Sequence, residues 1–195
     1  MKRIWRMGFF IIFASFSLIF FPFQSFAGDY YVSFKPGVYI PQYKHGFLQD
    51  EQFDEGPNLE AVFGKYVNNN LAGELGIGYF ETKGELASSS TQMKEQVFDI
   101  FYTLKGLIPL GPVELYGGGG FGVYISKTSF YPDHDVNTNL GLHALAGGIF
   151  NINERLFLGL EGKYLWSSAS FTNGSVTVDA QLDGIFVGAI VGVKF

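Results

Sequence analysis

The sequence predicts an all-β protein, namely an eight-stranded up-and-down antiparallel transmembrane β-barrel. Apolar residues alternate with polar or small ones in eight segments between positions 30 and 195, which is the period of a strand with two different faces. Long and short connections alternate strictly between the segments, as expected when every long loop leaves the same end of a barrel. The charged residues lie on the glycine-rich face, which places that face inside and the apolar face in lipid.

Composition excludes several classes of protein. The chain has 195 residues, no cysteine, 26 glycines and a formal net charge of −5, and its length favours a single domain. Aromatic residues make up 18% of the chain, too many for a disordered protein. The lack of cysteine excludes a disulfide scaffold and a thiolate metal site. A nucleic-acid binder is disfavoured, because too little positive charge is present to neutralise phosphates.

The first segment resembles a targeting sequence rather than part of the barrel. Its positive charges are Lys2, Arg3 and Arg6. The uncharged run Met7–Gly28 follows and ends with small residues before a cut between Ala27 and Gly28, which predicts a secretory signal peptide over 1–27. An uncleaved membrane anchor is the alternative. Cleavage leaves the barrel domain 28–195, with 10 basic and 18 acidic residues and hence a net charge of −8.

The strands are predicted in order along the chain by their period-two patterns. They cover 30–41, 58–67, 71–81, 96–105, 113–126, 139–150, 156–166 and 184–195. The last strand is the clearest, because Ile185, Val187, Ala189, Val191, Val193 and Phe195 form one wholly apolar face. The orientation of 58–67 stays open, because Glu60 and Lys65 fall on opposite faces of that strand.

The other six strands each have an apolar face that is almost free of charge. In chain order these faces are Val32, Phe34, Val38 and Ile40; Leu71, Leu75, Ile77 and Tyr79; Phe98, Ile100, Tyr102 and Leu104; Val113, Leu115, Phe121, Val123 and Ile125; Leu140, Leu142, Ala144, Ala146 and Phe150; and Leu156, Leu158, Leu160, Tyr164 and Trp166. Aromatic residues at strand ends on these faces are typical of membrane-interface girdles, and they are Tyr79, Phe150, Trp166 and Phe195. A soluble lipocalin-like barrel would have the opposite arrangement, with charge outside.

The connections fall into two classes. The long, polar ones cover 42–57, 82–95, 127–138 and 167–178, and the short ones cover Val67–Asn70, Gly106–Pro112 and Asn151–Arg155. A soluble β-sandwich has no reason to sort its loops in this way, whereas an up-and-down membrane barrel does.

These features resemble those of the small eight-stranded outer-membrane barrel family, which includes the membrane domain of OmpA, OmpX and OmpW. The resemblance covers residues 28–195 and is carried by "PLGPVELYGGGGFGVY", "GGIFNINERLFLGLEGKYLW" and a last strand that ends in Phe195. It implies a monomer in the bacterial outer membrane, in contact with lipid and lipopolysaccharide. It also implies that Phe195 is part of the signal read by the barrel-assembly machinery.

The inward face predicts a polar network inside the barrel. Its members are Lys35, Glu74, Asp99, Glu114, His143, Glu161, Lys163 and Lys194. Unpaired charges in a narrow interior are costly, so ion pairs and bound water that plug the barrel are expected. A permeation path through the same charges is the alternative.

Three further patterns are weaker. Gly117, Gly119 and Gly122 match a dinucleotide fingerprint but lie inside a predicted strand with no helix after them, so we expect barrel packing. The membrane-embedded lipid A deacylases carry His-x-Ser on a strand, but this chain has Ala144 and Leu145 after His143. The trio Asp133, Asp135 and Asn137 has the spacing of a calcium loop without its Gly and Glu, so a solvated loop is expected.

The sequence therefore predicts a protein without catalytic, cofactor-binding or metal sites. Its expected role is structural or in surface interaction, with an unknown ligand bound by the loops 42–57 and 127–138. A narrow channel, or an OmpW-like lateral path for small molecules, is the first alternative. A lipid-modifying enzyme that uses His143 is the second.

Overall fold

The computed structural model describes residues 29–42, 54–85, 92–130, 133–173, 176–181 and 183–195. Its strands are β1 (Tyr30–Pro41), β2 (Gly56–Asn68), β3 (Leu71–Glu85), β4 (Gln92–Leu110), β5 (Val113–Phe130), β6 (Asp133–Asn151), β7 (Leu156–Asn173), β8 (Val176–Gln181) and β9 (Gly184–Lys194). In these residues no helix is long and apolar enough to span a bilayer.

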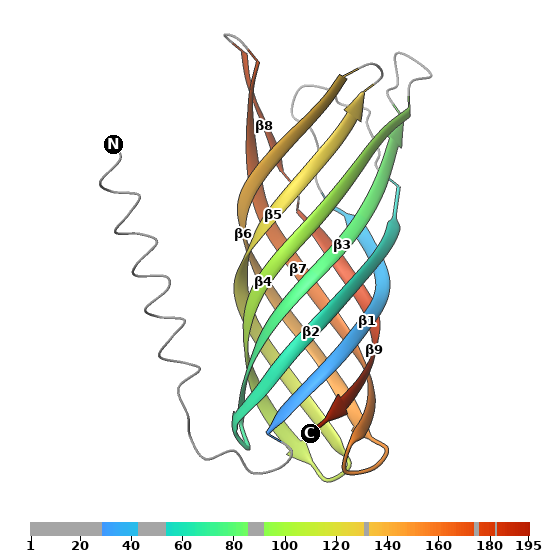
Figure 1. Ribbon diagram of the computed structural model, residues 1–195, viewed down its shortest axis with the longest axis vertical. Coiled ribbons are helices and arrows are strands. Elements are labelled where there is room, and N and C mark those ends of the chain that lie inside the picture. The colour runs from blue at the N-terminus through green and yellow to red at the C-terminus, as the bar shows by residue number, and fades with distance from the viewer. Residues whose placement is uncertain (1–28, 43–53, 86–91, 131–132, 174–175, 182) are drawn as a thin grey trace, which may run out of the picture.

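The strands close into a barrel, because every wall strand has two antiparallel neighbours. The sheet order runs β6-β5-β4-β3-β2-β1-β9-β7, and a β6–β7 pairing joins its two ends (Figure 1). Within the described part of the chain, the short strand β8 pairs only with the far part of β7. The wall therefore consists of eight strands, β1 to β7 and β9, which confirms the predicted eight-stranded up-and-down antiparallel topology.

The two ends of the barrel differ. At one end, which we call the terminal end, the backbones of Tyr30 and Phe195 exchange two hydrogen bonds (3.2 and 2.8 Å). The short hairpins β2–β3, β4–β5 and β6–β7 turn at the same end (Figure 1). The β4–β5 turn needs Gly111, whose φ of 69° is unfavourable for other residues. At the opposite, distal end, the hairpins β3–β4, β5–β6 and β7–β8 extend furthest.

Most of the predicted long connections prove to be strand extensions. The regions 82–95, 127–138 and 167–178 were expected to be loops, but their described residues continue the ladders of β3–β4, β5–β6 and β7–β8. The short connection 106–112 is also mostly strand, because β4 runs to Leu110. These predictions were wrong because both faces of a strand are polar beyond the lipid, so the period-two signal ends before the hydrogen-bond ladder does.

The structure settles the orientation of β2. Glu60 points into the barrel and is 3% exposed, while Lys65 points outward with its Nζ 5.0 Å from the centre of the Tyr30 ring. Lys65 lies near the terminal end of the wall, where a lysine on the outer face reaches the interface with its amine. The two charged residues are compatible with a single orientation of the strand, because only Glu60 lies within its buried stretch.

The predicted faces of the other strands are confirmed. Large apolar side chains on the outward face are exposed, as with Phe34, Ile100, Leu140 and Leu160. The lumen is filled by side chains and closed by two apolar layers. The terminal layer comprises Tyr31, Ala72, Leu107, Tyr116, Leu145, Ile149, Phe157 and Ile190, and the distal layer comprises Tyr39, Phe80, Val97, Tyr124, Leu165 and Phe186.

Several inward glycines make room for these rings. A Cβ added at Gly76 would collide with the Phe101 ring, and one at Gly192 would collide with the Phe157 ring. The narrow interior of a small barrel holds a large side chain only where a neighbouring position has none. Glycine on the inward face is therefore a packing requirement of this lumen.

The lumen as candidate functional site

The centre of the lumen holds a quartet of charged residues, Lys35, Glu74, Lys105 and Glu161. Each lysine bonds both carboxylates: Lys35 Nζ lies 3.4 Å from Glu74 and 2.8 Å from Glu161, and Lys105 Nζ lies 2.7 Å from Glu74 and 3.0 Å from Glu161. All four side chains are at most 5% exposed. The charges cancel, and each desolvated charge is in contact with two partners of opposite sign, which is the condition for tolerating buried ions.

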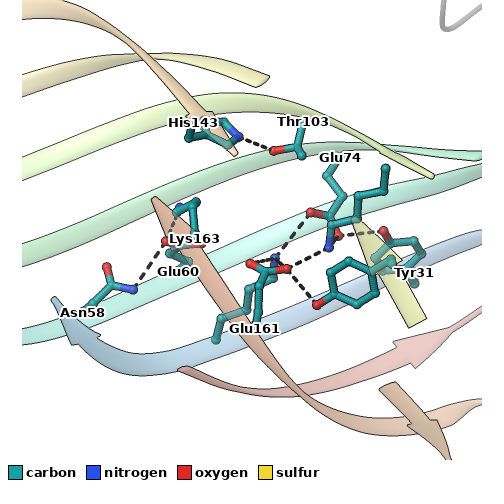
Figure 2. A network of polar contacts seen from close by, with 11 residues as sticks. Tyr31, Asn58, Glu60, Glu74, Thr103, His143, Glu161 and Lys163 are labelled. Atoms are coloured by element: carbon teal, nitrogen blue, oxygen red, sulfur yellow. Dashed lines mark hydrogen bonds and ion pairs between the residues drawn. The ribbon is translucent and has the colours of Figure 1, made fainter. Parts of the chain in front are cut away.

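Two tyrosines complete this quartet from the terminal side. The Tyr31 hydroxyl donates to Glu74 (2.7 Å) and the Tyr116 hydroxyl donates to Glu161 (2.8 Å). Lys105 Nζ also lies 4.0 Å from the centre of the Tyr116 ring, a cation–π contact. The quartet and tyrosines come from β1, β3, β4, β5 and β7, so the network ties together strands from all around the wall (Figure 2).

A second group lies further toward the distal end and is separate from the quartet (Figure 2). Lys163 pairs with Glu60, and Asn58 donates to Glu60 through its amide (3.4 Å). Lys163 Nζ also lies 4.3 Å from the centre of the Phe101 ring and 4.7 Å from that of Phe186. This lysine thus has one charged partner and two aromatic faces.

Asp99 belongs to the same distal region but makes no ion pair among the described residues. Gly78 is the register partner of both Glu60 and Asp99, so the two carboxylates flank a strand position without a side chain. Asp99 is 1% exposed, and its Oδ1 has no hydrogen-bond partner within the described part of the chain. The hydroxyls of Tyr124 and Ser126 and the Oδ1 of Asn58 are likewise buried without partners there.

His143 is placed in the lumen without a catalytic arrangement. Its Nε2 lies 2.8 Å from the Thr103 hydroxyl, and its ring packs edge-on against Phe101 at 5.6 Å. Its Nδ1 has no partner among the described residues, and Glu161 is bonded instead to Lys35, Lys105 and Tyr116. No serine hydroxyl and carboxylate are thus aligned with His143 in the described structure.

Glu114 and Lys194 lie at the terminal mouth, away from the quartet. Glu114 accepts a hydrogen bond from the Tyr66 hydroxyl (3.2 Å). Lys194 Nζ lies 5.0 Å from the centre of the Tyr66 ring and 5.7 Å from that of Phe157, and it forms no ion pair with a described residue. A cavity of about 20 Å³ opens between this mouth and the quartet, which is room for about one water.

The eight residues named from the sequence are thus divided among four places. Lys35, Glu74 and Glu161 meet in the quartet; Lys163 and Asp99 lie in the distal region; His143 pairs with Thr103; and Glu114 and Lys194 lie at the mouth. The network predicted from the sequence did not include Lys105 or Glu60. Lys105 lies on the predicted inward face, so the requirement for equal numbers of positive and negative charges in the lumen would have identified it. Glu60 could be placed in the lumen only once the orientation of β2 was known.

The structure places the glycine pattern and the calcium-loop-like pattern noted in the sequence within strands. Gly117, Gly119 and Gly122 lie inside β5, which continues into the β5–β6 hairpin. Asp133, Asp135 and Asn137 belong to β6 rather than to a solvated loop, so that expectation was wrong. Among the described residues no three acidic or histidine side chains are grouped to hold a metal ion. The cleavage position Ala27–Gly28 and most of 42–57 lie outside the described residues.

A closed barrel with an apolar outer wall and buried ion pairs inside defines a transmembrane β-barrel protein. The sequence comparison agrees: residues 12–195 match the family model described as "Outer membrane protein beta-barrel domain", and the chain belongs to that family. A search of curated proteins found no match.

Solved structures with this fold come from other bacterial outer-membrane proteins. Neisserial surface protein A is similar over 88% of this chain and 100% of its own, with a TM-score of 0.65 and 18% identity. OprG from Pseudomonas aeruginosa is similar over 87% of this chain and 96% of its own, with a TM-score of 0.60 and 16% identity. The outer membrane protein AlkL is similar over 90% of this chain and 95% of its own, with a TM-score of 0.54 and 15% identity. At such identities the likeness shows the fold alone.

Proposed function

We propose that this protein is a non-enzymatic outer-membrane barrel with a closed lumen, whose role is structural or in surface interaction at its distal hairpins. The observation that carries the proposal is the quartet of Lys35, Glu74, Lys105 and Glu161, which fills the lumen between two apolar layers. An ion that crossed would have to displace two doubly paired lysines and then pass buried aromatic rings.

We further propose that the chain is exported with residues 1–27 as a cleaved signal peptide, and that 28–195 insert as a monomer with the help of the barrel-assembly machinery. Phe195 suits the role of assembly signal, since its ring is exposed on the outer wall and stacks with Tyr30 at 6.3 Å. Lipopolysaccharide is the expected lipid neighbour at the distal end. The unknown surface ligand would meet 42–57 and the β5–β6 hairpin that contains 127–138.

Conductance in a planar lipid bilayer tests the closed lumen. The wild-type protein is expected to give no stable conductance steps, because its central charges are mutually neutralised. Stable steps that change in Glu161→Gln or Lys163→Met would overturn the proposal and establish the narrow channel instead. An enzyme would be established by turnover of lipid A or phospholipid that is lost in His143→Ala.

Cysteine labelling tests the orientation, since the chain has no cysteine of its own. A membrane-impermeant maleimide on whole cells should label Thr177→Cys, which lies in β8 at the distal end. It should not label Glu154→Cys, which lies in the turn between β6 and β7 at the terminal end, until the cells are opened. The reverse pattern would place the terminal end outside and contradict the proposed arrangement.

A further inference from the structure

The distal half of the lumen has more negative than positive charge. Lys163 is bonded to Glu60, whereas Asp99, which is 1% exposed, forms no ion pair with a described residue. In the described part of the chain, Lys163 is the only lysine or arginine at an inward position on the distal side of the quartet. Glu95 is also inward, but it lies beyond Val97 of the distal layer. Two carboxylates and one ammonium group therefore leave a net charge of −1 below that layer, and a buried charge requires a counter-charge.

His143 does not supply the missing positive charge. A histidinium ring has two N–H donors, and each needs an acceptor when it is buried. The Nε2 of His143 lies 2.8 Å from the Thr103 hydroxyl, but its Nδ1 has no partner among the described residues. The neutral ring is therefore the stable form, because the charged ring would leave one buried N–H unpaired.

The two carboxylates of the distal half converge over a glycine. Glu60 on β2 and Asp99 on β4 are both register partners of Gly78 on the strand between them. A Cβ added at Gly78 would collide with Asp99 Oδ1, so this oxygen lies over the glycine, on the side toward β2. Asp99 Oδ1 is buried and has no hydrogen-bond partner in the described structure. Two like charges thus approach each other where no side chain separates them.

Neutral oxygens without partners lie beside these carboxylates. The Asn58 amide donates to Glu60 (3.4 Å), which leaves its Oδ1 buried next to that carboxylate and unbonded in the described structure (Figure 2). The Tyr124 hydroxyl is also buried and unbonded there, and Tyr124 is the direct cross-strand partner of Asp99. Asn58 is 4% exposed and Tyr124 is fully buried. Each of these oxygens offers a lone pair, and such a set of oxygens suits a hard cation.

We propose that the distal half of the lumen binds one monovalent alkali cation between Asp99 and Glu60, with Asn58 Oδ1 and the Tyr124 hydroxyl as neutral ligands. One monovalent ion brings the charge of this group with Lys163 to zero, whereas a divalent ion would leave it positive. The ion joins β2, β4 and β5 through their inward side chains and so stabilises the folded barrel. The site goes beyond the proposed function and depends neither on the surface role nor on the orientation of the barrel.

The test is the sodium dependence of unfolding. The full-length barrel in phosphatidylcholine bilayers is unfolded with urea in sodium chloride and, at equal ionic strength, in choline chloride, whose cation is too large for a buried site. A ligand that binds only the folded state lowers the unfolding equilibrium constant, so this constant should be at least about three-fold smaller in sodium for the wild type. At equilibrium the ion exchanges whenever the barrel unfolds, whichever end it enters.

Two variants locate the ion, and one serves as the matched control. Asp99→Asn should remove the sodium effect, and in choline chloride it should be at least as stable as the wild type. Gly78→Ala should weaken the effect, because the new Cβ displaces the Asp99 carboxylate without removing its charge. Glu81→Gln, which removes a carboxylate of the outer wall, should keep the full effect. Each variant is compared with itself in the two salts, so a difference in overall stability does not affect the result.

Three results would overturn the site. Equal unfolding of the wild type in the two salts would show that no sodium ion is bound. An undiminished sodium effect in Asp99→Asn would place the ion elsewhere. Stabilisation by calcium chloride but not by sodium chloride would contradict the assignment of a monovalent ion. None of these results depends on conductance or on surface labelling, so a failure of the site is distinguishable from a failure of the proposed function.

Discussion

Both halves of the lumen contain buried lysines and carboxylates, but they differ in how fully these charges are paired. Toward the terminal end, two lysines and two glutamates form four ion pairs and receive two tyrosine hydroxyls. Toward the distal end, Lys163 pairs with Glu60 alone, and Asp99 has a buried oxygen without a described partner. One half is balanced in charge and the other has a carboxylate in excess.

The difference shows where the barrel is rigid and where it tolerates change. A balanced, fully bonded ionic network is strongly coupled, because removal of one member leaves a buried charge of opposite sign. A carboxylate that has no ion pair contributes desolvation cost without a matching attraction. Substitutions that remove a charge should therefore have opposite consequences in the two halves.

The largest effect is expected for Glu161→Gln. The substitution leaves Glu74 as the only carboxylate for Lys35 and Lys105, and the free energy of unfolding should fall by roughly 3–5 kcal/mol. Urea unfolding in lipid bilayers, followed by the emission of Trp166, measures it. Glu81→Gln on the outer rim is the matched control and should cost less than about 1 kcal/mol, since that pair is partly exposed. Equal losses in the two variants would refute the special role of the quartet.

A smaller loss is expected when a lumen glycine acquires a methyl group. In Gly76→Ala the new Cβ would collide with Phe101, which is held between His143 at 5.6 Å and Lys163 at 4.3 Å. Overpacking of this kind costs roughly 1–3 kcal/mol in unfolding free energy.

Gly162→Ala is the control for this glycine, because it faces outward and its Cβ would lie 4.0 Å from the nearest atom, the Phe186 oxygen. It should be neutral or stabilising by up to about 1 kcal/mol, since alanine restricts the unfolded chain. If both glycine variants lose the same stability, packing in the lumen is not the reason for the inward glycines.

The smallest effect is expected for Asp99→Asn in the distal half. The change removes a buried charge that has no described ion pair and keeps the shape of the side chain, so the unfolding free energy should change by less than about 1 kcal/mol or rise slightly. The same urea experiment measures it beside Glu161→Gln. A loss as large as that of Glu161→Gln would mean that the two halves are equally dependent on their carboxylates, and the comparison would fail.

The sequence anticipated the wall better than the interior. Strands such as β9 were recognised because one face meets lipid along its whole length, so every second residue is apolar. The distal parts of β5 and β6 were missed, since both of their faces are polar there. The lumen contacts were anticipated as a set of charges, but not as a quartet with Lys105 and a separate Glu60–Lys163 pair.

By itself, therefore, the sequence determined the class of fold, the number of wall strands and the face that meets lipid, because these follow from a local period of two and from which residues lipid excludes. Only the tertiary structure decided which lysine meets which glutamate and how β2 is oriented. Those contacts join residues as far apart as Lys35 and Glu161, and they depend on strand register and on closure of the barrel. Neither the register nor the closure can be read from the order of residues along one strand.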